Sequence, residues 1–165
     1  MKKLLYVLAA SVALFSSCAK DPIENTATVG MAGEWYVTAD VVDENGEVLY
    51  EDLYGMGPFI VSTFNTAANV PTEMYVYDNA NFWDFQVQVK ADAAAMTFAT
   101  DGMASNLTYE SQVQITGGKI TYGAAKTPSG QPADAIEFCV KFDDDDDGFT
   151  YKIHGYRYTG FTADE

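Results

Sequence analysis

Few residues in this sequence have the chemistry of a catalytic nucleophile or base. His154 is the single histidine of the 165 residues, and a serine or cysteine nucleophile needs such a base within hydrogen-bonding distance. Ser129 lies in a Pro-Ser-Gly turn sequence, and no Gly-x-Ser-x-Gly elbow is present. Cys139 alternates with Glu137 and Lys141 and has no evident group to activate its thiol. No catalytic set is visible. A glycosidase that uses a pair of acidic residues remains an alternative only because carboxylates are plentiful, since the sequence places no such pair.

An acidic run, Asp143-Asp144-Asp145-Asp146-Asp147-Gly148, is the one pattern that resembles a metal site. Asp143, Asp145 and Asp147 followed by Gly148 match the first half of a calcium loop, but His154 stands where the bidentate glutamate belongs. We therefore expect weak calcium binding or, alternatively, a solvated hairpin turn whose like charges discourage edge pairing. Zinc is not expected, because one histidine and one free cysteine cannot supply a typical ligand set, and no other cofactor is indicated.

Cys18 follows a segment with the features of a secretory leader. Lys2 and Lys3 precede an apolar run over residues 4–15, which is too short to span a bilayer, so residues 1–17 are predicted to be a signal peptide. The sequence Phe15-Ser16-Ser17-Cys18 resembles the lipobox of bacterial lipoproteins. That resemblance implies a mature N-terminus at Cys18 carrying diacylglycerol and a further acyl chain of the palmitate type; the alternative is an ordinary signal peptide with an incidental cysteine.

The predicted anchor indicates where the protein is expected to lie. Each buried acyl methylene contributes about 0.8 kcal/mol, so two or more chains give lasting attachment. Ala19 stands where lipoproteins retained at an inner membrane often have aspartate, which favours the outer membrane and leaves the periplasmic or surface face open. Residues 18–29 are polar and aperiodic, as expected of a flexible tether, and residues 30–165 are expected to form one domain.

The charge of the mature chain restricts its partners. Without residues 1–17 the chain loses two lysines, which leaves seven basic and 24 acidic residues and a net charge of -17. Such a domain repels nucleic acid and anionic lipid head groups. Contact with the membrane is therefore expected through the lipid alone.

Apolar and polar residues alternate through most of the chain, which predicts β-strands. In residues 34–42 the apolar series begins at Trp35, and in residues 82–90 it begins at Trp83. Asn45-Gly46 predicts a hairpin between the first two strands. Further strands are expected at residues 48–54, 59–64, 74–77, 96–100, 107–116, 119–122, 135–142 and 149–161, with turns at Gly117-Gly118 and 143–148 and a long irregular loop at 123–132.

About eight to ten strands without an amphipathic helix predict an all-β fold, either an antiparallel barrel or a β-sandwich. A barrel is favoured because it leaves no exposed strand edges. Gly33-Glu34-Trp35 resembles the Gly-x-Trp signature of lipocalin-like barrels. Arg157 shares a face with Tyr151 and Ile153, and we expect it to stack on Trp35, as in that family.

Three further segments resemble a family of small Bacteroides-type lipoproteins described as "lipid-binding putative hydrolase". They are Gly33-Glu34-Trp35-Tyr36-Val37, the segment from Thr127 to Ile136 (TPSGQPADAI), and the segment from Gly155 to Phe161 (GYRYTGF). The resemblance covers nearly the whole mature chain. It implies a β-barrel with an apolar ligand, and hydrolysis only through the family's name.

The functional hypothesis is a lipid-anchored barrel that binds a small apolar or amphipathic molecule at its open end, with residues 123–132 as a lid. The candidate ligand-binding residues are Trp35, Trp83, Phe85, Phe138, Tyr151 and Arg157. The same side chains could instead fill a solid core. The alternative function is an accessory or interaction subunit of an envelope complex, with the outward tyrosines Tyr36, Tyr75, Tyr77, Tyr156 and Tyr158 as its contact surface. A hydrolase of unknown substrate comes third.

Overall fold

A computed structural model describes residues 24–165, which form ten β-strands and one short helical turn. The predicted signal peptide, Cys18 and the first half of the tether lie outside the described residues. The strands are β1 (Gly33–Val42), β2 (Val48–Tyr50), β3 (Phe59–Asn65), β4 (Glu73–Tyr77), β5 (Gln86–Asp92), β6 (Thr97–Ala99), β7 (Ala104–Ser105), β8 (Gln112–Lys126), β9 (Pro132–Phe142) and β10 (Thr150–Arg157), followed by the 3-10 turn η1 (Thr162–Asp164). No helix in this part of the chain has the length and apolarity needed to cross a membrane.

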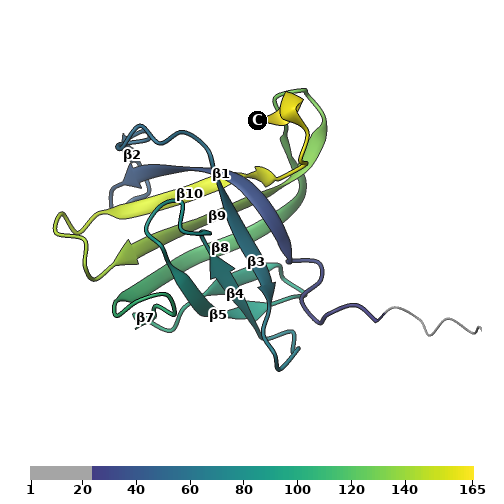
Figure 1. The fold of residues 1–165 in the computed structure, drawn as a ribbon, viewed down its shortest axis with the longest axis horizontal. Helices are drawn as coiled ribbons and strands as arrows, with labels where there is room; N and C mark the ends of the chain where they lie inside the picture. The colour runs from purple at the N-terminus through teal and green to yellow at the C-terminus, as the bar shows by residue number, and fades with distance from the viewer. Residues whose placement is uncertain (1–23) are drawn as a thin grey trace, which may run out of the picture.

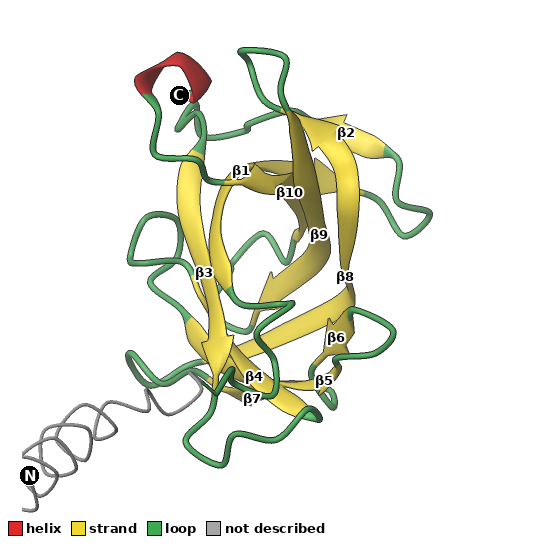
Figure 2. Ribbon diagram, turned by 90° about the vertical axis from the view of Figure 1, so that its right-hand side faces the viewer, coloured by secondary structure: helices red, strands yellow, loops and turns green. Residues whose placement is uncertain are grey.

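Eight of the strands close into an antiparallel barrel. Strands β1, β3, β4, β5, β6, β8, β9 and β10 each pair with the next, and β10 pairs back with β1 from Trp35↔Arg157 to Val42↔Thr150. Strands β2 and β7 lie outside this ring, against β1 and β8. Figures 1 and 2 show β10 beside β1 where the ring closes. The predicted antiparallel barrel is therefore confirmed, in an arrangement consistent with a lipocalin-like barrel, and the β-sandwich alternative is wrong.

The core follows directly from the alternation of the sequence. In β1 the side chains of Trp35, Val37, Ala39 and Val41 are buried inside, while the residues between them face outward. The inward side chains of the other strands join them in one continuous cluster with exposures of 8% or less. Of the two alternatives left open by the sequence, the structure shows an interior filled by side chains, so a ligand would have to bind at an end or on the outside.

The predicted turn at Gly117-Gly118 is wrong. Strand β8 runs through both glycines, and its register against β9 shifts between Thr116 and Lys119, which marks a β-bulge. Gly117 takes a positive φ of 64°. A Cβ atom at Gly118 would overlap the ring and carbonyl oxygen of Phe98. The glycines thus allow β6 to approach β8 closely. A Gly-Gly dipeptide alone does not show whether it forms such a bulge or a turn.

The predicted loop at 123–132 is also wrong, and so is its assignment as a lid. Strand β8 extends to Lys126 and β9 begins at Pro132, so only five residues form the connection. The turn is closed by hydrogen bonds from the Thr127 amide to the Gln131 carbonyl and from the Gly130 amide to the Thr127 carbonyl. The segment is a projecting hairpin that lies beside the C-terminus (Figure 1).

Several predicted strands are shorter than expected, and two of the breaks lie at the same end of the barrel. Strand β2 stops at Tyr50 instead of residue 54. Strand β5 begins at Gln86, because residues 82–85 belong to a loop in which Asp84 has a φ of 51°. The irregular segments that follow β2 and precede β5 both lie at this end.

Candidate functional site

The barrel end formed by loops 43–58, 78–85 and 143–149 is rich in aromatic side chains, and we call it the aromatic end. Its central loop is organised by Asp78, which is fully buried. The Oδ1 atom of Asp78 accepts hydrogen bonds from the amides of Ala80 and Phe85, and Oδ2 accepts them from Phe82 and Trp83. A carboxylate that accepts several amide hydrogen bonds fixes an otherwise irregular backbone. It holds Phe82 and Trp83 across the barrel end.

The aromatic rings of this end form one packed layer. Trp83 stacks on Phe142 with 4.7 Å between ring centroids and 6° between planes. Phe82 stacks on Phe59 at 5.5 Å and meets Tyr151 edge-on at 5.1 Å. Such pairs contribute roughly 0.5–1.5 kcal/mol each beyond the area they bury. The layer closes the core at the aromatic end, and the outer edges of its rings face the surface.

Residues 48–58 run over this layer, and we call them the flap. Asp52 shapes the flap: its carboxylate accepts hydrogen bonds from the amides of Met56 and Gly57, and its own amide donates to Oδ1 of Asp40. The hydroxyl groups of Tyr54 and Tyr151 lie 2.9 Å apart, and the Tyr54 ring lies 6.4 Å from that of Phe82. The flap is thus tied to the barrel by the pairing of β2 with β1, by the Asp52–Asp40 hydrogen bond and by the contacts of Tyr54.

The flap exposes an unusual amount of apolar surface. Six of the thirteen large hydrophobic residues that are exposed in the described chain lie within its first nine positions. They are Val48, Leu49, Tyr50, Leu53, Tyr54 and Met56. Single exposed apolar residues are common on proteins, whereas several within one short segment make that segment a candidate binding surface.

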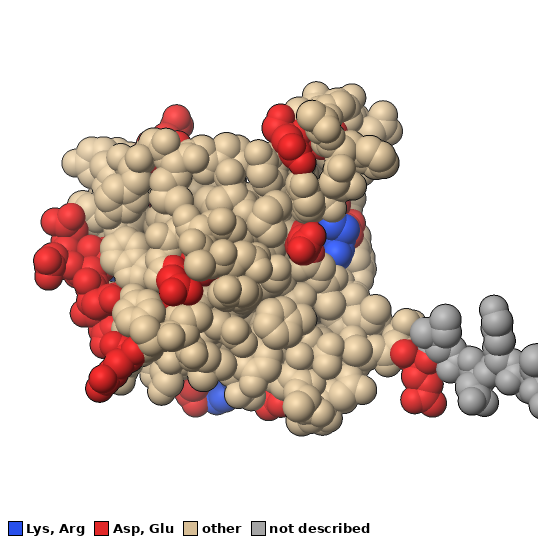
Figure 3. All heavy atoms as spheres, in the orientation of Figure 1, with Lys and Arg blue, Asp and Glu red and all other residues tan. Residues whose placement is uncertain are grey.

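Carboxylates surround the aromatic end. Figure 3 shows them gathered along the side of the molecule where β2 and the β9–β10 hairpin lie in Figure 1. Oδ1 and Oδ2 of Asp144 accept hydrogen bonds from Nε1 of Trp83 and the hydroxyl of Tyr109. Burial opposes ionisation of Asp144, but these hydrogen bonds outweigh it and lower the pKa of the carboxyl group. Burial, together with hydrogen bonds to Tyr54 and Asp145, raises the pKa of Tyr151 well above its usual value.

The structure does not bring the calcium candidates together. Asp143 accepts a hydrogen bond from the Gln112 amide, and Asp145 accepts from the amides of Asp147 and Phe149. In residues 24–165, no group of three or more acidic, histidine or cysteine side chains is arranged to hold a metal ion. The expected calcium site at Asp143, Asp145 and Asp147 is not supported, because Asp145 closes the hairpin turn and Asp143 accepts from the first residue of β8 instead.

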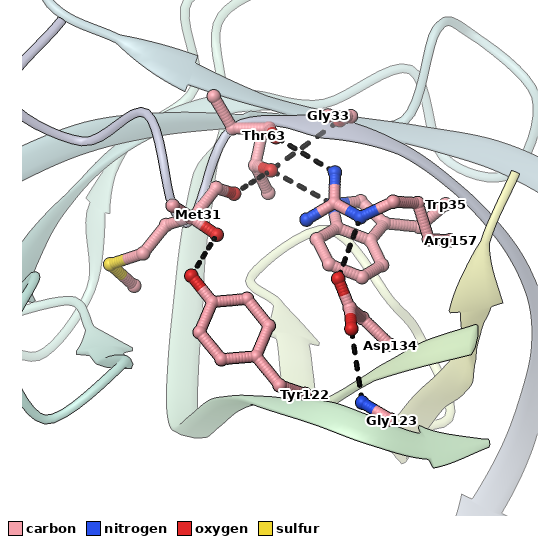
Figure 4. A network of polar contacts seen from close by, with 10 residues as sticks. Met31, Gly33, Trp35, Thr63, Tyr122, Gly123, Asp134 and Arg157 are labelled. Atoms are coloured by element: carbon pink, nitrogen blue, oxygen red, sulfur yellow. Dashed lines mark hydrogen bonds and ion pairs between the residues drawn. The ribbon is translucent and has the colours of Figure 1, made fainter. Parts of the chain in front are cut away.

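The opposite end of the barrel contains Trp35 and Arg157. Cζ of Arg157 lies 4.4 Å from the centroid of the Trp35 ring, so the expected stacking is present. Arg157 also donates to Oδ2 of Asp134 and to the Ala32 carbonyl, and Nε1 of Trp35 donates to Oγ1 of Thr63 (Figure 4). Trp35 has no exposed surface. The polar groups of Trp35 and Arg157 at this end are bonded to one another's neighbours within the protein. We therefore assign these two residues a structural role.

The predicted ligand-binding residues therefore do not form one site. Trp83, Phe85 and Tyr151 all contact Phe142 at the aromatic end. Phe138 lies inside the barrel against Phe98. Trp35 and Arg157 lie at the far end. Sequence alternation identified the inward face correctly, but it carries no information on depth along the barrel.

The geometry around His154 does not form a catalytic relay. Its Nε2 atom lies 2.9 Å from Oδ2 of Asp40 and 3.3 Å from Oγ1 of Thr38. A triad needs the nucleophile and the orienting carboxylate on different ring nitrogens, whereas both lie against the same one here. Burial raises the pKa of the Cys139 thiol, which makes it a poorer nucleophile. The contacts of His154 and the raised pKa of Cys139 are not those of hydrolase machinery.

The two C-terminal motifs singled out in the sequence contact each other. Oδ1 of Asp164 accepts a hydrogen bond from the Ser129 amide, and Oδ2 accepts one from the Thr159 hydroxyl. The Tyr156 hydroxyl donates to the Asp164 carbonyl. Together with the Asp134–Arg157 ion pair, these bonds hold the β8–β9 hairpin to the C-terminal segment. The motifs stabilise one end of the barrel and lie away from the aromatic end.

Several important residues of the aromatic end were not predicted from the sequence. Asp78 lies between two predicted strands and has no distinguishing sequence feature, and Asp52, Tyr54 and Phe82 were assigned to strands. The available signal was the cluster of apolar residues between Val48 and Met56, which lies in a segment that also contains Asp52, Gly55, Gly57 and Pro58.

The chain was compared with models of protein families and with curated proteins. A family model described as "Lipid-binding putative hydrolase" matches residues 20–162, which is most of the chain. A comparison with curated proteins returned no match.

Proposed function

The chain belongs to the family described as "Lipid-binding putative hydrolase", and from this premise we propose that it binds an amphipathic lipid at the aromatic end of its barrel. The contact surface consists of the flap and the ring layer beneath it. The acyl chain lies across this layer, because the barrel interior is already filled by side chains.

The observation that carries the proposal is the group of exposed apolar side chains on the flap, of which Tyr54 packs against Phe82 and Tyr151 of the aromatic layer. Each methylene group that leaves water contributes about 0.8 kcal/mol. Covering eight methylenes would therefore contribute about 6 kcal/mol before the cost of ordering the chain. Lifting Tyr54 would break one hydroxyl contact with Tyr151 and expose the Phe82 ring to the ligand.

We further propose that Cys18 carries the lipid anchor and that the protein lies at the outer membrane, as its lipobox-like sequence suggests. The described chain enters the barrel at the end opposite β2 and the β9–β10 hairpin (Figure 1). An anchored molecule would thus direct its aromatic end away from the membrane. Fractionation tests the anchor: the wild-type chain is expected in outer-membrane fractions and Cys18→Ser in the soluble fraction. Wild-type protein in the soluble fraction would contradict it.

An accessory role in an envelope complex is the second candidate function. It rests on outward tyrosines of β1 and the C-terminal strand, where Tyr36 packs edge-on against Tyr156 and lies 5.9 Å from the Tyr158 ring. Their rings are half-buried by one another and suit a protein contact. A partner held by this surface would be lost on replacing Tyr36 and Tyr158 by serine and retained on replacing Tyr54.

Lipid binding can be tested by quenching of tryptophan fluorescence. The two tryptophans report on opposite ends, because Trp83 is part of the aromatic end and Trp35 is buried at the other. The probe is dibromododecyl maltoside below its micelle concentration, added to the Cys18→Ser chain, which cannot be acylated. We expect saturable quenching that disappears in Trp83→Phe. Quenching that persists in this variant would place the tail near Trp35 and overturn the proposal, as would an absence of quenching.

The flap's part in binding needs a matched pair of variants. Tyr54→Ser removes a ring from the proposed surface, and Tyr122→Ser removes a comparably exposed ring from the opposite end. The proposal predicts weaker quenching in the first variant and unchanged quenching in the second. Equal effects would show that the probe does not select the aromatic end.

A further inference from the structure

We infer that the ligand of the aromatic end is a cationic amphiphile, in which an alkyl chain carries an ammonium group. This inference rests on the proposed function and adds the class of head group. The apolar flap specifies the tail, and the charges around it specify the head.

The charge distribution is strongly one-sided. Loops 43–58, 78–85 and 143–149 contain 12 of the 24 acidic residues of the chain and no lysine or arginine. In the described chain, the basic residues lie on the barrel strands. The molecule is therefore polarised, with a negative aromatic end that attracts cations and repels anions at a distance.

The acidic groups also lie in contact with the rings. Asp144 is hydrogen-bonded to the indole of Trp83 and to the Tyr109 hydroxyl, and Asp145 is hydrogen-bonded to the Tyr151 hydroxyl. Tyr50 and Tyr54, both about half exposed, lie on the flap close by. An ammonium group is attracted both by the faces of aromatic rings and by carboxylates, so these two features recognise the same chemistry. A carboxylate or phosphate head group would meet repulsion from both.

A purely electrostatic partner would not use the flap. A lysine-rich peptide or a small cation could contact the carboxylates, but it would leave Val48, Leu49, Leu53 and Met56 exposed to water. An uncharged lipid would cover those side chains and leave the carboxylates without a counterion. An ammonium group joined to an alkyl tail satisfies both requirements, which is why we select this class.

Three ligands with the same twelve-carbon tail test the inference: dodecyltrimethylammonium, dodecyl maltoside and dodecanoate, each below its micelle concentration. Binding to the Cys18→Ser chain is measured by Trp83 fluorescence, and circular dichroism checks that the protein stays folded. We expect the ammonium compound to bind about tenfold more tightly than the maltoside, and dodecanoate to bind more weakly than either. The preference should shrink in 0.5 M salt, about the concentration at which exposed charges are screened within a few ångströms.

Two variants remove one negative charge each. Asp144→Asn loses a charge beside Trp83, while Glu137→Gln loses one on the outer face of β9, where it pairs with Lys152. Asp144→Asn is expected to weaken the ammonium compound about threefold to tenfold and to leave the maltoside unchanged. Glu137→Gln should change neither. If both variants lost the same affinity for the ammonium compound, the preference for it would come from net charge alone. The assigned contact with Asp144 would then be wrong.

The possible results separate this inference from the proposed function. If dodecanoate binds as tightly as the ammonium compound, the head-group inference fails and lipid binding at the aromatic end stands. If none of the three ligands binds, both fail. If tetramethylammonium or a pentalysine peptide binds as tightly as the tailed ammonium compound, the site is a cation site without an apolar component, which also overturns the inference.

Discussion

Trp83 stacks on Phe142 with nearly parallel rings, although Trp83 lies in the loop after β4 and Phe142 ends β9. This contact joins a loop to the end of a strand that is far from it in sequence, and it sets one edge of the ring layer. The layer in turn closes the barrel and supports the flap. The proposed binding surface therefore depends on a few residues that place irregular backbone across one end of a regular fold.

Asp78→Ala should remove the acceptor for four backbone amides in the loop that carries Phe82 and Trp83. Because buried amides without partners are costly, we expect a loss of about 3 kcal/mol in the free energy of unfolding, measured with urea. Asp78→Asn keeps one acceptor oxygen, so its loss of unfolding free energy should be smaller. The control is Asp101→Ala, which removes an exposed aspartate; a similar loss there would contradict the role of Asp78.

Asp52→Ala should loosen the flap without unfolding the barrel. The Met56 and Gly57 amides would lose their acceptor, and they lie at the surface where the fold depends little on them. Hydrogen exchange should become faster at residues 52–58 and stay unchanged in β8 and β9. Glu51→Ala, one position earlier, is the matched control and should exchange like the wild-type chain.

Arg157→Lys tests the closed end of the barrel. Lysine keeps the charge but loses the planar stack on Trp35 and cannot contact both Asp134 and the Ala32 carbonyl. We predict a loss of about 1–3 kcal/mol in unfolding free energy and a red shift of Trp35 emission, measured in a Trp83→Phe background. Ligand affinity should not change. A drop in affinity with unchanged stability would instead assign Arg157 to the ligand site.

Asp164 should make the hairpin contact sensitive to acid. Hydrogen bonding by Ser129, Thr159 and Thr127 lowers the pKa of Asp164 to about 2, from an ordinary value of 3.8. A carboxyl group with a lowered pKa in the folded state stabilises it above the ordinary value and loses this contribution as the pH falls toward 2. Protection of the β8–β9 turn amides, taken as the exchange rate relative to the intrinsic rate at each pH, should therefore fall between about pH 4 and pH 2. In Asp164→Asn, this protection should already be low at about pH 5 and should not fall further with pH.

The sequence predicted the barrel because its information is local and repeated. Alternation of apolar residues at Trp35, Phe85 and Phe138 reports which face is inward, and the pairing of β10 with β1 places Arg157 on Trp35. The binding surface depends on single aspartates that fold loops around their carboxylates, with positive φ angles at positions such as Asn79 and Asp84. Such arrangements leave no periodic signal. For the same reason, glycines in a bulge and in a turn could not be told apart.

The most direct test of the central claim is to map ligand contacts by NMR. Dodecyltrimethylammonium is titrated into isotopically labelled Cys18→Ser protein, and the backbone amide shifts are followed. We predict that the largest changes occur in residues 48–58, 78–85 and 142–151, with little change around Trp35, Phe98 and Arg157. Changes centred on those three residues, or spread evenly over the barrel, would contradict an amphiphile site at the aromatic end.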